Sequence, residues 1–165
     1  MSNKFPLGID SFEKLRAGNY YYIDKTAFIQ KLLESTFEVN LITRPRRFGK
    51  TLILSMLEDF FNIEKNSKEN FQGLIISESS DLCDTWMNKW PTIFLTFKSV
   101  EGGDFESAYG MLTVLIADLC KKCDFLLQNP LVNAEDRAIF HSLMARKADA
   151  PQIKSSLSTL MRMLN

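Results

Sequence analysis

The sequence contains little cysteine and histidine, no net charge and no long apolar run. Three cysteines and one histidine argue against a disulfide framework and against a zinc site, which needs a full set of such ligands. The 20 basic residues balance the 20 acidic ones, so net charge does not favour nucleic acid as a partner. No apolar run approaches the roughly 20 residues that cross a bilayer, and the polar start does not resemble a secretory signal. We therefore expect a cytoplasmic protein with reduced thiols and no membrane contact.

Apolar and aromatic residues are plentiful enough for a folded core. The 165 residues are 45% hydrophobic and include 13 phenylalanines. Such a chain can bury enough apolar surface to fold. Its length suits one domain better than two large ones, and we expect residues 1–165 to belong to a single domain.

The spacing of apolar residues predicts mostly helices, with two strands. Helical spacing and capping residues predict helices over 12–17, 25–34, 49–61, 104–127, 134–147 and 151–164. Region 104–127 is compatible with one long helix or two. Short apolar runs predict buried strands over 37–43 and 92–97.

A predicted strand, a loop and a helix surround the sequence Gly49-Lys50-Thr51. This arrangement is typical of a phosphate-binding loop with the pattern GxxxxGK[ST]. The start of a helix offers unpaired N–H groups and the positive end of a dipole to an anion. Gly49 lets the backbone approach the phosphates, Lys50 places a positive charge against them, and the Thr51 hydroxyl can bind Mg²⁺.

The loop departs from the general pattern at its first position, where Arg44 stands instead of glycine. A bare Gly-Lys-Thr also occurs where the lysine is only a solvated side chain at a tight turn. The apolar segment before the loop and the amphipathic helix after it favour the phosphate-binding interpretation. The predicted nucleotide-contacting residues are Arg44, Pro45, Arg46, Arg47, Phe48, Gly49, Lys50 and Thr51.

The segment 41–51, Leu-Ile-Thr-Arg-Pro-Arg-Arg-Phe-Gly-Lys-Thr, resembles the Walker A region of the bacterial AAA-ATPase-like family. Members of that family often carry a PD-(D/E)XK-type nuclease domain further along the chain, and they often have arginine at the position of Arg44. Residues 22–26 (Tyr-Ile-Asp-Lys-Thr) and 57–61 (Leu-Glu-Asp-Phe-Phe) also resemble the family. The resemblance covers 6–97. It implies an α/β fold, a partial P-loop NTPase (AAA-like) domain in which helices flank a parallel sheet, and it implies binding of ATP with Mg²⁺.

Hydrolysis of ATP by such a domain requires a Walker B strand that ends in an acidic residue. The run 92–97 ends without one, and the run 74–78 is too short and lies too soon after the loop. We expect the chain to be truncated before the Walker B strand, as the N-terminal part of an AAA-ATPase-like P-loop domain. It would then bind Mg-ATP as part of an ATPase without hydrolysing it alone, and no catalytic residue is assigned.

Two other functions stay open on the sequence. The chain could be a protein-interaction module that lacks nucleotide function, or the N-terminal part of a nuclease-associated protein. We expect a nucleotide as the partner, leave a protein partner or a homo-oligomer open, and do not expect this segment to bind nucleic acid. The sequence past Asn165 would separate an ATPase from a nuclease-associated protein.

Several other side chains have both a functional and a structural interpretation. Tyr20, Tyr21 and Tyr22 could stack on an adenine base, or they could pack as half-buried side chains. Cys120 and Cys123 form a CxxC, which we interpret as two cysteines of one helix rather than as a metal site.

Overall fold

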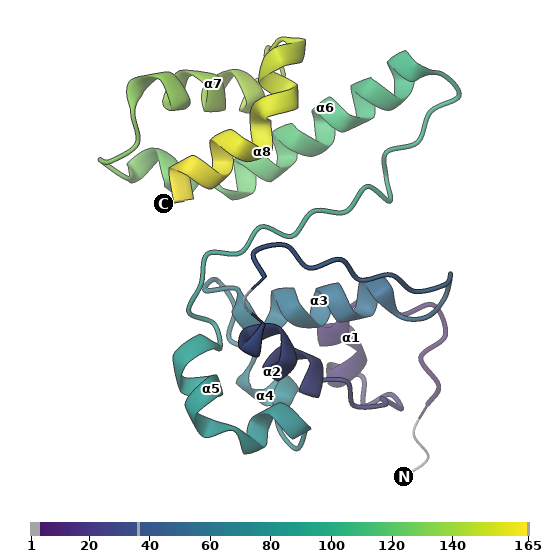
Figure 1. Cartoon of the computed structure of the whole chain (residues 1–165). Coiled ribbons are helices and arrows are strands. Elements are labelled where there is room, and N and C mark those ends of the chain that lie inside the picture. Colours follow the sequence, from purple (N-terminus) through teal and green to yellow (C-terminus); the bar gives the residue numbers. More distant parts are fainter. Residues whose placement is uncertain (1–3, 36, 165) are drawn as a thin grey trace. The chain divides into compact units, whose positions relative to one another are not determined.

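The computed structural model describes residues 4–35 and 37–164, which divide into two compact units (Figure 1). The first unit ends at Phe94 and the second begins at Leu95. The first contains the helices α1 (Phe12–Ala17), α2 (Ala27–Glu34), α3 (Lys50–Phe61), α4 (Lys68–Phe71), η1 (Ile75–Glu78) and α5 (Ser80–Trp86). The second contains α6 (Phe105–Lys122), η2 (Asp124–Gln128), α7 (Ala134–Met144) and α8 (Ala150–Leu164).

Side-chain caps explain where several of these helices begin. Ser11 accepts a hydrogen bond from the Lys14 N–H at 3.3 Å and starts α1, as its sequence predicts. Asp104 starts α6 in the same way, by accepting from the Ser107 N–H at 2.7 Å. The predicted helices are confirmed, and region 104–127 divides into α6 and η2.

The core of the first unit is built around buried aromatic rings. Phe71 packs against Phe12 and Phe60, with ring centroids 4.9 Å and 5.3 Å apart. All three side chains are fully buried. The cluster that they join also contains Ile29, Ile53, Met56, Leu74 and Ile76. Helix α3 therefore packs its buried face on α1 and α4, which fixes the direction in which its N-terminus points.

The second unit is a helical unit in which α7 packs on both α6 and α8. Its buried side chains include Ile116, Cys120, Phe140, Leu143, Ile153 and Leu160. Arg162 of α8 pairs with Asp136 of α7, with 2.5 Å between guanidinium nitrogen and carboxylate oxygen. The hydrogen bond from Arg162 is the main reason that the pKa of Asp136 lies below its ordinary value.

The predicted α/β fold is wrong for the described residues, which form helices and irregular segments but no strand. The parallel sheet of a P-loop NTPase domain is therefore not seen. Strand-type pairing within residues 4–35 and 37–164 is limited to two isolated bridges, Lys4–Tyr20 and Asn62–Trp90.

The two segments predicted as strands, 37–43 and 92–97, are irregular. Val39 and Leu41 are 85% and 86% exposed. A strand needs a neighbouring strand to satisfy its N–H and C=O groups. An apolar run indicates a preference for that state, but it does not supply the partner, and none stands beside either segment in the described part of the chain.

Helix α2 begins later than predicted, because Asp24 is used elsewhere. The expected start was Lys25, with Asp24 as the cap. Instead Asp24 accepts hydrogen bonds from Thr26 and from the Ile75 N–H, which lies 51 residues further along the chain. The helix begins at Ala27. Among the described residues, no helix has both the length and the apolar character that crossing a membrane would require.

Candidate functional site

The predicted phosphate loop folds as a tight turn that leads directly into α3. The Phe48 N–H donates to the Pro45 carbonyl oxygen at 3.4 Å. Arg47 and Gly49 both have left-handed backbone conformations, with φ of 67° and 74°. Gly49 occupies the cap position of α3, where a residue without Cβ adopts this conformation at little cost. The sequence therefore placed the loop and the start of the helix correctly, although the strand expected before them is absent from the described residues.

The N-terminus of α3 is open. Its first backbone hydrogen bond runs from the Ile53 N–H to the Gly49 carbonyl oxygen at 2.9 Å. The N–H groups of Lys50, Thr51 and Leu52 find no acceptor among residues 4–35 and 37–164. No side chain caps this end, and the first turn contains no acidic residue. Unpaired N–H groups and the helix dipole together give this end a positive potential.

Helix α7 shows what a closed N-terminus looks like in the same chain. Asn133 accepts from the Asp136 N–H at 2.7 Å, and its side-chain amide donates to the Asp136 carboxylate at 2.8 Å. Glu135 and Asp136 place two carboxylates in the first turn. One unpaired N–H group and the positive dipole end of α7 are therefore met from within the chain.

The ammonium group of Lys50 turns back into the loop. It donates to the carbonyl oxygens of Arg44 and Pro45, the latter at 3.3 Å. The structure thus brings three of the predicted site residues together around one positive charge. Thr51 is exposed on the first turn of α3, where its hydroxyl is accessible to a ligand.

The other predicted residues of the loop face solvent. Arg44, Arg46, Arg47 and Phe48 are all exposed. No ion pair joins these three arginines to a carboxylate of the described residues. Their guanidinium groups add positive charge around the open end of α3.

A small, mainly apolar cavity of about 200 Å³ lies beside Gly49. Its lining includes Tyr21, Tyr22, Lys25 and Leu52. Ligand pockets usually enclose about 300–1,000 Å³, so this cavity would take one part of a nucleotide rather than the whole. Tyr21 and Tyr22 thus lie where a base could reach them, whereas Tyr20 is not part of the lining.

Tyr22 also has a structural role. Its ring packs edge-on against Phe12 with centroids 5.4 Å apart, and its hydroxyl donates to the Met56 sulfur at 3.4 Å. Burial is the main reason that the pKa of Tyr22 is raised above its ordinary value. Tyr22 therefore belongs partly to the core, and Tyr21 is the more exposed of the two rings.

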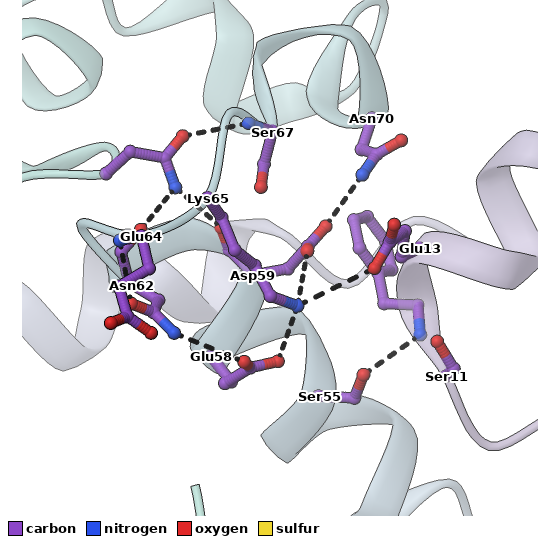
Figure 2. Close-up of polar contacts among 12 residues, drawn as sticks. Ser11, Glu13, Ser55, Glu58, Asp59, Asn62, Glu64, Lys65, Ser67 and Asn70 are labelled. Atoms are coloured by element: carbon purple, nitrogen blue, oxygen red, sulfur yellow. Dashed lines mark hydrogen bonds and ion pairs between the residues drawn. The ribbon is translucent and has the colours of Figure 1, made fainter. Parts of the chain in front are cut away.

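The opposite end of α3 is anchored by a polar cluster (Figure 2). Lys65 donates to Glu58 at 2.8 Å and to Asp59 at 3.0 Å, and the Asn70 amide donates to the other oxygen of Asp59 at 2.9 Å. Asp59 is only 1% exposed. Burial by itself would lower the pKa of Lys65, but the hydrogen bonds and charges of Glu58 and Asp59 outweigh it and raise that pKa. The cluster holds α3 in place from its C-terminal end.

A larger cavity of about 680 Å³ lies elsewhere in the first unit, beside α4 and α5. Lys65, Lys68, Cys83 and Lys89 are among its lining residues, and none of the predicted loop residues is. The lining residues carry charges of both signs, and the ammonium group of Lys65 is already paired with Glu58 and Asp59. The smaller cavity is therefore the one that bears on the loop.

The described residues contain no cluster of three His, Cys, Asp or Glu side chains that could hold a metal ion. Mg²⁺ at this site would therefore depend on the Thr51 hydroxyl and on oxygens of its ligand. Cys120 and Cys123 are both buried. Burial raises the pKa of Cys120 to about 12, which leaves a neutral, unreactive thiol.

Sequence reasoning missed Lys25 as a residue of this site. A Cβ built on Gly49 would lie 3.8 Å from the Lys25 ammonium nitrogen. The two residues are 24 positions apart, so no local pattern connects them. The only signal was the Asp-Lys-Thr sequence at 24–26, because aspartate and threonine around one residue favour a turn that fixes its direction.

Comparison with known proteins gives one family and one curated relative. The family model described as "Predicted AAA-ATPase" matches residues 6–163. A protein of Azotobacter chroococcum mcd 1, described as "Uncharacterized protein in vnfD 5'region", is 34% identical over 148 residues. That alignment covers 89% of this chain and 26% of the relative, so the chain spans about a quarter of the relative's length. No solved structure matches the chain.

Proposed function

The chain belongs to the family of predicted AAA-ATPases, and on that premise we propose that its loop 44–51 binds ATP together with Mg²⁺. The observation that carries the proposal is the open N-terminus of α3, which begins at Gly49-Lys50-Thr51. An open helix end in a basic loop is suited to the phosphate groups of a nucleotide.

Each part of the loop has a role in this proposal. The N–H groups of Lys50 and Thr51 donate to phosphate oxygens, and the missing Cβ of Gly49 lets these oxygens come close. The Lys50 ammonium moves from the carbonyl oxygens of Arg44 and Pro45 to the phosphates. The Thr51 hydroxyl would help to hold Mg²⁺, which would supply positive charge to the phosphates.

The proposal covers binding rather than hydrolysis. A carboxylate is needed to order Mg²⁺ and to polarise the attacking water. The segment 44–54, from the loop through the first turn of α3, contains no acidic residue. Binding is therefore what the residues of this loop can provide, and catalytic groups are not assigned.

Calorimetric titration with Mg-ATP tests the proposal on the wild type, on Lys50→Ala and on Lys31→Ala. Lys50→Ala removes a charge-assisted contact, so affinity should fall about ten- to a hundredfold. Lys31 is an exposed lysine of α2, and its replacement removes the same charge away from the loop. A wild type that melts cooperatively but binds no nucleotide would refute the proposal. Equal affinities of all three proteins would do the same.

A further inference from the structure

We infer that Lys25 is a second phosphate-binding cation of this site, acting beside Lys50; the inference rests on the proposed function. Its ammonium nitrogen lies over the loop glycine, 3.8 Å from the place that a Cβ on Gly49 would take. That glycine has no side chain to keep an anion away from the backbone. An anion bound at the start of α3 would therefore lie within reach of the Lys25 side chain.

The backbone around Lys25 is fixed although its side chain is exposed. One carboxylate oxygen of Asp24 accepts from the Thr26 N–H at 2.8 Å and from the Thr26 hydroxyl at 2.7 Å. The other oxygen accepts from the Ile75 N–H at 2.7 Å, and the Ile76 N–H donates to the Thr26 hydroxyl oxygen at 3.1 Å. Thr26 is fully buried. Lys25 therefore stands between two anchored residues, and its position relative to Gly49 is set by the fold.

The charge of Lys25 is not neutralised by the chain. No ion pair joins it to a carboxylate of the described residues. Its neighbour Asp24 directs both oxygens to Thr26 and Ile75 instead. Burial by itself would raise the pKa of Asp24, but these hydrogen bonds outweigh it and hold that pKa below its ordinary value. Asp24 thus remains a hydrogen-bond acceptor for Thr26 and Ile75.

A cavity at the same point supports the inference. The cavity of about 200 Å³ has both Lys25 and Gly49 in its lining, and the rest of its lining is mainly apolar. A nucleotide offers this combination, because its base suits an apolar cavity and its phosphates suit cations at the rim. Lys25 stands at the junction of these two surfaces.

Calorimetric titration of Lys25→Ala with Mg-ATP and with magnesium tripolyphosphate tests this role. Tripolyphosphate has the phosphates but no base, so it isolates the contribution of charge. We expect both ligands to bind about tenfold more weakly to Lys25→Ala, as expected for one charge-assisted hydrogen bond. Lys25→Arg should recover most of the affinity, and Lys31→Ala should bind like the wild type.

The outcomes separate this inference from the proposed function. If Lys50→Ala weakens binding and Lys25→Ala behaves like Lys31→Ala, the role of Lys25 is refuted and the phosphate loop stands. If Lys25→Ala weakens ATP alone, the side chain only lines the cavity, and the inference fails. If the folded wild type binds neither ligand, both ideas fail. Matching melting curves of Lys25→Ala and the wild type establish that each comparison is made on folded protein.

Discussion

The two ends of α3 are built on opposite principles. At its C-terminal end, Glu58 and Asp59 are held by Lys65 and Asn70, and every one of these contacts comes from within the first unit (Figure 2). At its N-terminal end, which begins at Lys50, there is no acidic residue and no side-chain cap. The polar side chains at the C-terminal end are paired within the chain, whereas the N-terminal end presents unpaired N–H donors and positive charge.

The open start of α3 is not a general property of the helices of this chain. The chain caps several other helix starts with ordinary side chains, Ser11 at α1, Asp104 at α6 and Asn133 at α7, although α2, α4 and α5 also begin without a side-chain cap. An N-cap of that kind stabilises a helix by about 1 kcal/mol. A helix start that forgoes this stabilisation and gathers cations is suited to an anion from outside the chain.

The largest expected effect is on stability, at the C-terminal end of α3. Asp59→Ala should lower the free energy of unfolding of the first unit by about 3 kcal/mol, because it removes the buried partner of Lys65 and leaves the Asn70 amide without an acceptor. Chemical denaturation followed by tryptophan fluorescence measures the change, since Trp86 and Trp90 both lie in this unit.

Glu64→Ala is the matched control for Asp59→Ala. Glu64 is an exposed carboxylate on the neighbouring segment, so its loss should change stability by less than about 0.5 kcal/mol. Equal effects of the two substitutions would show that the cluster does not anchor α3. Mg-ATP affinity of the folded Asp59→Ala protein should stay at the wild-type value, because the open end is unchanged.

A smaller effect should appear in the pH dependence of stability. The pKa of Lys65 is raised above its ordinary value of 10.5. Its contribution to stability is therefore fully present below pH 10.5 and is lost as the pH rises through the higher folded-state pKa. The difference in unfolding free energy between the wild type and Lys65→Met should shrink in alkaline denaturant titrations. A difference that stays constant would mean that the charge of Lys65 contributes nothing.

The smallest effect on stability comes from giving the open end a carboxylate of its own. Thr51→Glu places an anion in the first turn of α3, which should stabilise the helix by about 0.5 kcal/mol. The same change should abolish Mg-ATP binding, because it supplies an internal anion and removes the Mg²⁺ ligand. Thr51→Gln, which lacks the charge, should leave stability nearly unchanged. Loss of stability in Thr51→Glu would contradict an electropositive helix end.

Local patterns in the sequence were enough to predict the longer helices, whereas the short helices α4, η1 and α5 were missed. Ser11 caps α1, as expected, Asp104 caps α6 where the predicted helix begins, and apolar spacing located α3, α7 and α8. The strands were wrong because pairing is not a local property. Segment 37–43 has the composition of a buried strand, yet its Val39 is 85% exposed. Composition describes what a segment prefers, whereas a sheet depends on what lies beside it.

In the candidate site, too, local features could be predicted from the sequence and long-range contacts could not. The loop 44–51 could be located from its own residues, because Gly49-Lys50-Thr51 at a helix start is a local pattern. The approach of Lys25 to Gly49 could not be predicted in this way, because the turn at Asp24 is fixed by Ile75 and Ile76 far along the chain. The cluster around Lys65 was missed for a related reason, because its segment is polar and has no helical or alternating period.

The hydrogen bonds of Lys50 to the carbonyl oxygens of Arg44 and Pro45 make ligand binding an exchange of partners. An incoming anion competes with two dipoles that already surround the ammonium group. A ligand with a single phosphate gains less from that exchange than a chain of phosphates, which offers more negative charge in place of the two partial charges. If the loop binds nucleotides as proposed, we expect it to discriminate among AMP, ADP and ATP more sharply than a loop whose lysine pointed into water.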